Sequence, residues 1–320
     1  MRRLVGKAAS WGMDGAMCGM MNALQWRRRA DSCTKKELED YLDVCSPMSR
    51  EEYYRMPPAT RPRQHDGWIE WDTPLPSGFA ENDRAHVRFY PAARKNAPVL
   101  LLLHALMSAS DVGYRRVAAT FNKRGWSVAF PHLPYHYSRT PKNTLNGELA
   151  ITSDLVRNAE GLRQAVVELR QLMALLRTRG AREFAIIGTS YGGWTGALLS
   201  FLERDFRFLA LVQPIVNVEK AIWENPGASS MRRSLRSLGH AQNQITRHNH
   251  LISPLHGIPL CDAKSIIITA GLYDKVSPLE DLKVLSSRWK GSRLLRVRQG
   301  HFGYRALRET LVEVEPFMGS

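Results

Sequence analysis

The stretch FAIIGTSYGGWTG, Phe184–Gly196, runs from four apolar residues into a serine that stands between glycines. A short apolar run is typical of a buried strand, and small residues after Ser190 allow a sharp turn into a helix that packs closely on that strand. Such a turn exposes the serine hydroxyl and places the backbone N–H of Tyr191 beside it. The stretch therefore predicts a nucleophilic serine at Ser190 rather than an ordinary loop.

Apolar strands and amphipathic helices alternate on both sides of this stretch. The alternating RAHVRFY at 84–90 is typical of a strand with one exposed face. In the segment 152–180, leucines recur every seven residues and predict a long helix, which Ser153 or Thr152 caps and Gly180 ends. This alternation predicts an α/β fold with a mostly parallel sheet covered by helices. Further buried strands are expected at 97–104, 126–130, 208–216, 264–271 and 292–300, and further helices at 111–123 and 278–289.

A serine hydroxyl becomes a good nucleophile when a base takes its proton and an acid orients that base. Asp274 and His301 each follow a predicted strand, so both are expected at the carboxyl edge of the sheet, where sites of such folds are built. Ser190, Asp274 and His301 are therefore the candidate catalytic residues. Two other interpretations stay open: Asp274 can be a helix cap or turn residue, with Glu280 and Asp281 as rival acids, and His301 can be a surface histidine.

An acyl-transfer site also needs N–H donors for the oxygen that gains charge in the tetrahedral intermediate. The stretch LLLLHALMSAS, residues 100–110, ends a predicted buried strand at His104. The N–H of Leu106, or that of Ala105, can then face the N–H of Tyr191, and Leu106 and Tyr191 are the candidate oxyanion-hole donors. His104 is expected to organise this loop and to lie near the substrate rather than to act as the base.

Together these motifs resemble the α/β-hydrolase superfamily, over residues from roughly 85 to the C-terminus. The resemblance implies an eight-stranded sheet, a Ser-Asp-His triad, hydrolysis of an ester, thioester or amide, and no cofactor. One departure is that relatives commonly have His-Gly where this chain has His104-Ala105. The matching stretches are HALM at 104–107, GTSYGG at 188–193, GLYDKVSP at 271–278 and GHFGY at 300–304.

A second resemblance concerns PHLPYHYSRTP, residues 131–141. It looks like the Pro-aromatic-His-x-x-Arg loop of a hydrolase subgroup that includes proposed lipid deacylases, which implies that His136 and Arg139 line the substrate site. The spacing of His132 and His136 could also be that of a metal pair, but no further ligand cluster accompanies it. No metal site is therefore expected.

The segment 1–65 is expected to be a helical arm, followed by a hydrolase domain over 66–320 with a helical cap inserted at about 223–263. The arm begins with an Arg-flanked stretch whose apolar run is interrupted by polar residues, so it is a poor spanning helix. It is interpreted as a helix packed on the body or, alternatively, as an amphipathic segment on a membrane surface. Four cysteines without paired spacing favour a reducing, cytoplasmic setting.

The formal net charge of +15 attracts any anionic surface, but no nucleic-acid recognition motif accompanies the basic residues, so no nucleic acid is expected as a partner. The leading hypothesis is a serine hydrolase acting on a carboxylic ester, with lipid esters and thioesters included. An acyltransferase that uses the same three residues and a non-catalytic binding protein on the same fold are the alternatives. The acyl chain, the leaving group and the oligomeric state are not predicted.

Overall fold

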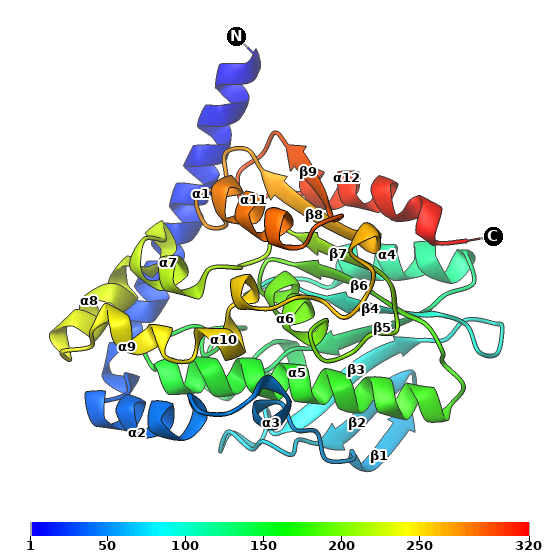
Figure 1. Ribbon diagram of the computed structural model, residues 1–320, viewed down its shortest axis with the longest axis horizontal. Coiled ribbons are helices and arrows are strands. Elements are labelled where there is room, and N and C mark those ends of the chain that lie inside the picture. The colour runs from blue at the N-terminus through cyan, green and yellow to red at the C-terminus, as the bar shows by residue number, and fades with distance from the viewer. Residues whose placement is uncertain (1, 320) are drawn as a thin grey trace.

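A single sheet runs through the centre of residues 2–319, the part of the chain that the computed structural model describes (Figure 1). Within that part it has nine strands in the order β1-β2-β3-β5-β4-β6-β7-β8-β9. Strands β1, β2, β3 and β5 pair antiparallel, and all pairs from β5 to β9 are parallel. The strands are β1 Thr60–His65, β2 Trp68–Asp72, β3 Arg84–Tyr90, β4 Val99–Leu103, β5 Ser127–His132, β6 Phe184–Thr189, β7 Phe206–Val212, β8 Ile266–Gly271 and β9 Arg293–Val297.

Strand β1 is the main departure from the expected architecture. The resemblance implies eight strands, and within the described residues the sheet has one more. Strand β1 lies in the proline-containing segment expected to belong to the arm, so the sheet begins before the boundary placed at residue 65. All six of its residues are exposed, and it pairs only with β2, with a shift in register between Thr60 and Arg63. A strand with no buried side chain leaves no hydrophobic pattern in the sequence from which to predict it.

The central strands bury both faces. In β4, Leu101 and Leu103 belong to one hydrophobic cluster, and Leu100 and Leu102 to a second cluster on the opposite face, because successive side chains of a strand alternate. Helices α5 Leu155–Thr178, α6 Tyr191–Leu199 and α11 Leu279–Arg288 cover the first face. Helices α4 Val112–Lys123 and α12 Arg305–Val314 cover the second. The continuous apolar runs in the sequence are thus explained by burial on both sides.

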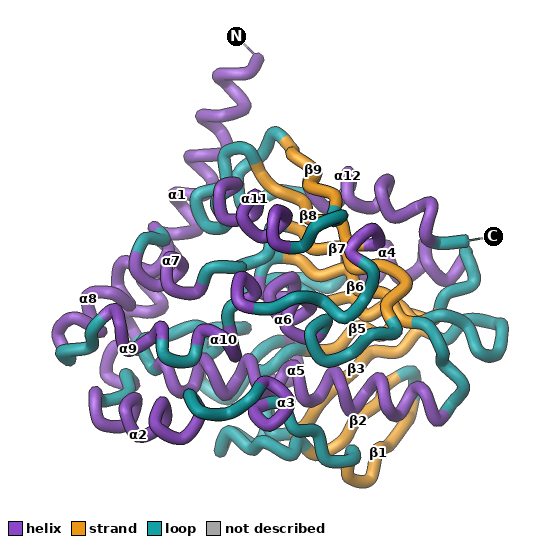
Figure 2. Tube along the Cα trace, in the orientation of Figure 1, coloured by secondary structure: helices purple, strands orange, loops and turns teal. Residues whose placement is uncertain are grey.

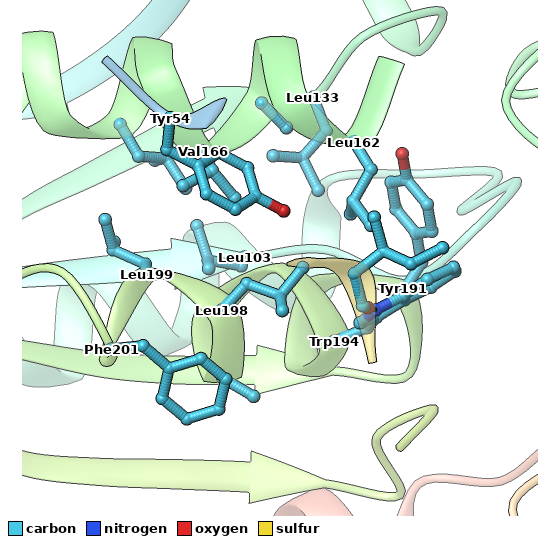
Figure 3. Close-up of a cluster of buried hydrophobic side chains, with 14 of the residues drawn as sticks. Tyr54, Leu103, Leu133, Leu162, Val166, Tyr191, Trp194, Leu198, Leu199 and Phe201 are labelled. Carbon is cyan, nitrogen blue, oxygen red and sulfur yellow. Dashed lines mark hydrogen bonds between the residues drawn. The ribbon is translucent and has the colours of Figure 1, made fainter. Parts of the chain in front are cut away.

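Helix α5 packs on α6 through the apolar stripe predicted from its sequence. Figure 3 shows Leu162 and Val166 of α5 facing Leu198 of α6 and Leu103 of β4. The leucines that recur every seven residues are all buried. The cap differs from the expected one: Asp154, rather than Ser153 or Thr152, accepts a hydrogen bond from the first-turn N–H of Arg157 (3.0 Å). Ser153 and Thr152 are buried beneath this turn instead.

The N-terminal arm and the cap are both helical, and they meet beside the sheet (Figure 2). Helix α1 packs against the cap along part of its length and extends beyond the body at its N-terminal end (Figure 1). No helix within residues 2–319 combines the length and the apolar character needed to cross a membrane. The arm has α1 Arg2–Arg27, α2 Lys35–Cys45 and α3 Arg50–Tyr53, and the cap has α8 Ser229–Ser237, α9 Gln242–Thr246 and α10 Asn249–Ile252. Helix α7 Val218–Trp223 lies just before the expected start of the cap. Short 3-10 helices lie at Arg29–Asp31, Tyr137–Arg139, Pro226–Ala228, Pro254–His256, Ala263–Ser265 and Glu315–Phe317.

Arg139 connects the loop after β5 to α5 inside the protein. Its side chain is 1% exposed and donates to both carboxylate oxygens of Glu168, at 2.5 and 2.9 Å. The same guanidinium also donates to the carbonyl oxygens of Asn82 and His132. The expectation that Arg139 lines the substrate site is therefore wrong, because its donors are occupied by buried protein groups.

This ion pair generates a prediction about stability. Replacing Arg139 by Met leaves the Glu168 carboxylate buried without its cation and removes a donor from the carbonyl groups of Asn82 and His132, so we expect a loss of about 3–5 kcal/mol in the free energy of unfolding. Urea denaturation followed by circular dichroism measures it. The matched control is Lys36→Met, which breaks an exposed Lys–Asp pair on α2 and should leave the unfolding midpoint unchanged. An Arg139→Met protein as stable as the control would contradict the structural role.

Candidate active site

The turn between β6 and α6 holds Ser190 in an unusual conformation. Its φ of 51° and ψ of −109° lie outside the regions that non-glycine residues ordinarily adopt, and its N–H donates to the carbonyl of Val212 (2.8 Å). Close backbone packing holds the turn. A Cβ atom on Gly192 would collide with the carbonyl oxygens of Leu103 and His104, and one on Gly188 would lie 2.5 Å from the carbonyl oxygen of Gly192. The glycines around Ser190 are thus required by space.

Ser190, His301 and Asp274 lie in one hydrogen-bonded line. The Ser190 Oγ is 2.9 Å from His301 Nε2, and His301 Nδ1 is 2.8 Å from Asp274 Oδ2. The three residues come from the loops that follow β6, β9 and β8, all at the carboxyl edge of the parallel strands. The structure therefore brings together the three side chains that the order of strands in the sequence singled out.

The carboxylate of Asp274 is buried and accepts four hydrogen bonds. Oδ1 accepts from the N–H groups of Val276 and Ser277, both at 2.8 Å. Oδ2 accepts from His301 and from the side-chain amide of Gln213 (2.6 Å). Asp274 is thus a turn residue and the partner of His301 at once, so the two interpretations of this residue are compatible.

The rival acids do not reach His301. Asp281 pairs with Lys220 at 2.9 Å, and Glu280 pairs with Lys283 on the surface of α11. Both stand in the first turn of that helix, where a carboxylate interacts favourably with the helix dipole. Their place in the sequence is explained by the helix alone.

His301 has a proton arrangement that suits a base. With Nδ1–H donating to Asp274, its Nε2 is left to accept from the hydroxyl of Ser190. Burial alone would lower the pKa of His301, but the charge of Asp274, its hydrogen bond and the charge of Asp14 outweigh burial and raise that pKa above its ordinary value.

The contact with Asp14 was not predicted from the sequence. Asp14 lies in α1, and its two carboxylate oxygens accept from the N–H of His301 at 3.0 and 2.9 Å, while Oδ1 also accepts from the N–H of Phe302 at 3.2 Å. The only signal in the sequence is that Asp14 is the one acidic residue within α1. A single acidic residue in a helix does not predict a contact with a histidine 287 positions away in the sequence.

Of three consecutive N–H groups in the loop after β4, one has no acceptor among the described residues. The N–H of Ala105 donates to the hydroxyl of Tyr114 (3.0 Å), and the N–H of Met107 donates to Nε2 of His136 (3.2 Å). Within residues 2–319, the N–H groups of Leu106 and Tyr191 meet no acceptor. Of the two N–H groups that the sequence left open, that of Ala105 is therefore occupied and that of Leu106 is free of an acceptor in the described part of the chain, as is that of Tyr191 at the start of α6.

His104 and His136 support this loop from inside the protein. Each is fully buried, donates through Nδ1 to a carbonyl, and accepts a backbone N–H through Nε2, from Leu133 for His104 and from Met107 for His136. Burial lowers the pKa of both rings, that of His136 to about 4. The two histidines are thus neutral parts of the loop structure, and the expectation that they lie against substrate is corrected.

The spacing of His132 and His136 does not produce a metal centre in the described part of the chain. His132 Nδ1 lies 2.8 Å from the hydroxyl of Ser138, whereas His136 is occupied as described above. Among residues 2–319, no three His, Cys, Asp or Glu side chains gather as a metal site would need.

A cavity of about 540 Å³ adjoins Asp274 on the side of the cap. Its volume is that of a small-molecule pocket. It lies between α7 and the loop that follows β8, and its charged lining is Lys220, Glu224, Asp274, Lys275, Glu280 and Asp281. Four of these side chains are acidic and two are basic, so acidic groups predominate around the cavity.

Comparison with known proteins gives structural matches only. No protein-family model and no curated protein matches the sequence. An acetyl xylan esterase from Paenibacillus sp. R4 superposes with a TM-score of 0.58 at 13% identity, covering 90% of this chain and 97% of its own. Acetyl xylan esterase 1 from Thermoanaerobacterium sp. JW/SL YS485 gives 0.54 at 17% identity, covering 90% and 94%.

A thermophilic esterase from Thermogutta terrifontis, Est2, gives a TM-score of 0.51 at 18% identity, covering 83% of this chain and 96% of its own. At such low identity these matches concern the arrangement of strands and helices and not the chemistry. This chain has the fold of the α/β-hydrolase superfamily.

Proposed function

We propose that this protein is a serine hydrolase that cleaves carboxylic esters through an acyl-enzyme intermediate. The observation that carries the proposal is the line of hydrogen bonds from Ser190 through His301 to Asp274. The N–H groups of Leu106 and Tyr191, which meet no acceptor within residues 2–319, support it. The three structural neighbours, whose names describe them as esterases, support the reaction class. A binding protein on the same fold has no need of this complete arrangement.

The proposed reaction has two halves. His301 takes the proton of Ser190 as its Oγ attacks the ester carbonyl, and the N–H groups of Leu106 and Tyr191 donate to the oxyanion that forms. The leaving alcohol receives the proton from His301, and the acyl group stays on Ser190. Water then attacks the acyl-enzyme, with His301 as base, and releases the acid. Asp274 keeps the proton of His301 on Nδ1 and stabilises the imidazolium.

Several acyl donors fit this chemistry. Lipid esters and thioesters carry the same electrophilic carbonyl, and an alcohol in place of water would make the reaction an acyl transfer. A panel of short-chain esters, phospholipids and thioesters, with and without an acceptor alcohol, separates these cases by the product formed.

The nucleophile is tested with a fluorophosphonate probe. We expect the wild-type protein to be labelled at Ser190, and Ser190→Ala to lose the label, because only an activated hydroxyl attacks the phosphorus. Peptide mass spectrometry locates the label. Ser287→Ala, an exposed serine on α11, is the matched control and should be labelled like the wild type. A folded wild-type protein that takes no label, or takes it equally after Ser190→Ala, would contradict the proposal.

The raised pKa of His301 generates a second prediction. The base must be neutral, so kcat/KM toward p-nitrophenyl acetate should rise with pH through a midpoint above 6.5, the ordinary pKa of histidine. Asp274→Asn removes the charge that raises this pKa, so the midpoint should fall, and the maximal rate should drop by roughly 10⁴. Glu280→Gln, the exposed rival acid, should keep the wild-type profile. A midpoint that Asp274→Asn does not move would disagree with the assigned roles.

We also propose that α1 contacts an anionic membrane surface. Between residues 9 and 23 its outward face carries only small and apolar residues at helical spacing, all exposed: Ala9, Gly12, Met13, Ala16, Gly19, Met20 and Ala23. Two exposed tryptophans of α1 lie beside cations, Trp11 beside Lys7 and Lys275, and Trp26 beside Arg29 and Arg233. The only acid of α1, Asp14, is buried.

This surface combines an apolar face, flanking tryptophans and positive charge, which is the pattern of helices that lie in a lipid interface. A second copy of the chain is disfavoured as the occupant, because the helix has cations near both ends and no exposed acid to pair with them. A lipid surface would also be the source of a lipid ester substrate.

Vesicle sedimentation tests the contact. We expect the wild-type protein to bind phosphatidylglycerol vesicles more than phosphatidylcholine vesicles, with binding that weakens as salt rises. Met13→Glu/Met20→Glu should weaken binding at least about tenfold, because two apolar side chains no longer enter the interface. Val44→Glu/Val312→Glu, two exposed valines elsewhere, is the control. Equal binding by the two double variants would overturn this part, and a dimer that only the methionine variant disrupts would indicate a second copy instead.

A further inference from the structure

We propose that Asp14 of α1 is a positioning residue for His301, holding the backbone of the loop that carries this base. The proposal rests on the function proposed above in one respect: Asp14 affects catalysis only if His301 is the base. The contact itself is tested below without measuring activity. The N-terminal helix thereby becomes part of the active site, although it is remote from the site in sequence.

The carboxylate of Asp14 accepts hydrogen bonds from the backbone of the loop that carries His301. Asp14 is 3% exposed, and its hydrogen-bond partners are the N–H groups of two consecutive residues, His301 and Phe302. These N–H groups can only donate, so the ionised carboxylate, which can only accept, fits them. Losing it would leave two partly buried backbone N–H groups without an acceptor, which would destabilise the native conformation of the loop.

Gly300 shows how closely the two segments fit. A Cβ atom at Gly300 would lie 2.6 Å from both carboxylate oxygens of Asp14, so no larger residue fits there while Asp14 keeps its place. On its other side, the carbonyl of Gly300 accepts from the side-chain amide of Gln213 (2.7 Å), which also donates to Asp274. The loop is thus held between Asp14 and Gln213, immediately before the residue that contacts Ser190.

The cap in turn holds Asp14. The side-chain amide of Asn22 donates to the carbonyl of Pro226, and its carbonyl oxygen accepts from the hydroxyl of Ser229. One turn further along α1, the side-chain oxygen of Gln25 accepts from the N–H of Met231. These bonds set the position of α1 on the cap and, through the rigid helix, the position of Asp14.

Charge adds a second consequence to the geometry. The charged groups that face His301 are Asp274 from the loop after β8 and Asp14 from α1, and the uncharged hydroxyl of Ser190 lies on the other side of the ring. Those that face Asp14 are Asp274, His301 and the Cys18 thiol of its own helix. Burial raises the pKa of Asp14, and its charge raises that of His301. Removing the carboxylate should therefore make His301 easier to deprotonate.

The experiment is a histidine titration by NMR on the full chain labelled with ¹³C at the imidazole Cε1 position, with His301→Gln to assign the signal. We expect Asp14→Asn to lower the pH midpoint of the His301 signal and to shift the amide signals of His301 and Phe302. Asp40→Asn, an exposed acid on α2, is the matched control and should change neither. An unchanged His301 midpoint together with unchanged amide signals in Asp14→Asn would overturn the proposal.

Gly300→Ala supplies an independent variant should Asp14→Asn fold poorly. Its methyl group would displace the carboxylate, so we expect it to lower the His301 midpoint in the same direction. In Asp14→Ala the space beside Gly300 is empty, so adding Gly300→Ala should change the His301 midpoint little further. If the two substitutions instead shift that midpoint additively, the contact is contradicted.

Fluorophosphonate labelling of Ser190, measured against pH, then links the contact to the reaction. If the wild type is labelled and Asp14→Asn is labelled with the same pH dependence, the positioning role is refuted. If the wild type takes no label, the hydrolase proposal is refuted, and the NMR result still tests the contact.

Discussion

The close approach of α6 to the ends of β4 and β6 is the contact on which the remainder of the site depends. At Gly188 and Gly192 the backbones touch with no room for a Cβ atom, and this forces the turn that places Ser190 at positive φ. From there the hydroxyl reaches His301, and the start of α6 leaves the N–H of Tyr191 without an acceptor among the described residues. The conformation of Ser190 and the free N–H of Tyr191 are therefore consequences of one packing contact, and the proposed nucleophile and donor depend on it.

The parts of the site that could be predicted from the sequence are those fixed by local pattern. Ser190, Asp274 and His301 each follow an apolar strand, and parallel strands bring their carboxyl ends to one edge of the sheet. Strand direction therefore turns three positions far apart in sequence into neighbours. The same local reasoning narrowed the second oxyanion donor to two residues, and only the hydrogen bond of Ala105 to Tyr114 distinguishes them.

The parts that could not be predicted depend on contacts between distant segments. The motif around Arg139 predicts a residue that contacts substrate. Its guanidinium instead donates to Glu168, which lies 29 positions away on α5. Asp14 belongs to no motif, and its role follows from how the cap holds α1. Strand β1 has no buried side chain and so leaves no periodic signal. In each case the sequence lacks the information because the decisive partner is selected by tertiary packing.

The contact between Asp14 and the His301 loop joins two segments that are 287 positions apart. During synthesis Asp14 emerges long before His301, so the histidine loop can take its held conformation only after all the residues between them have been made. Contacts of such long range carry a large loop-closure cost and are expected late in folding. The serine turn depends on contacts of shorter range and can therefore form before Asp14 holds the loop of His301.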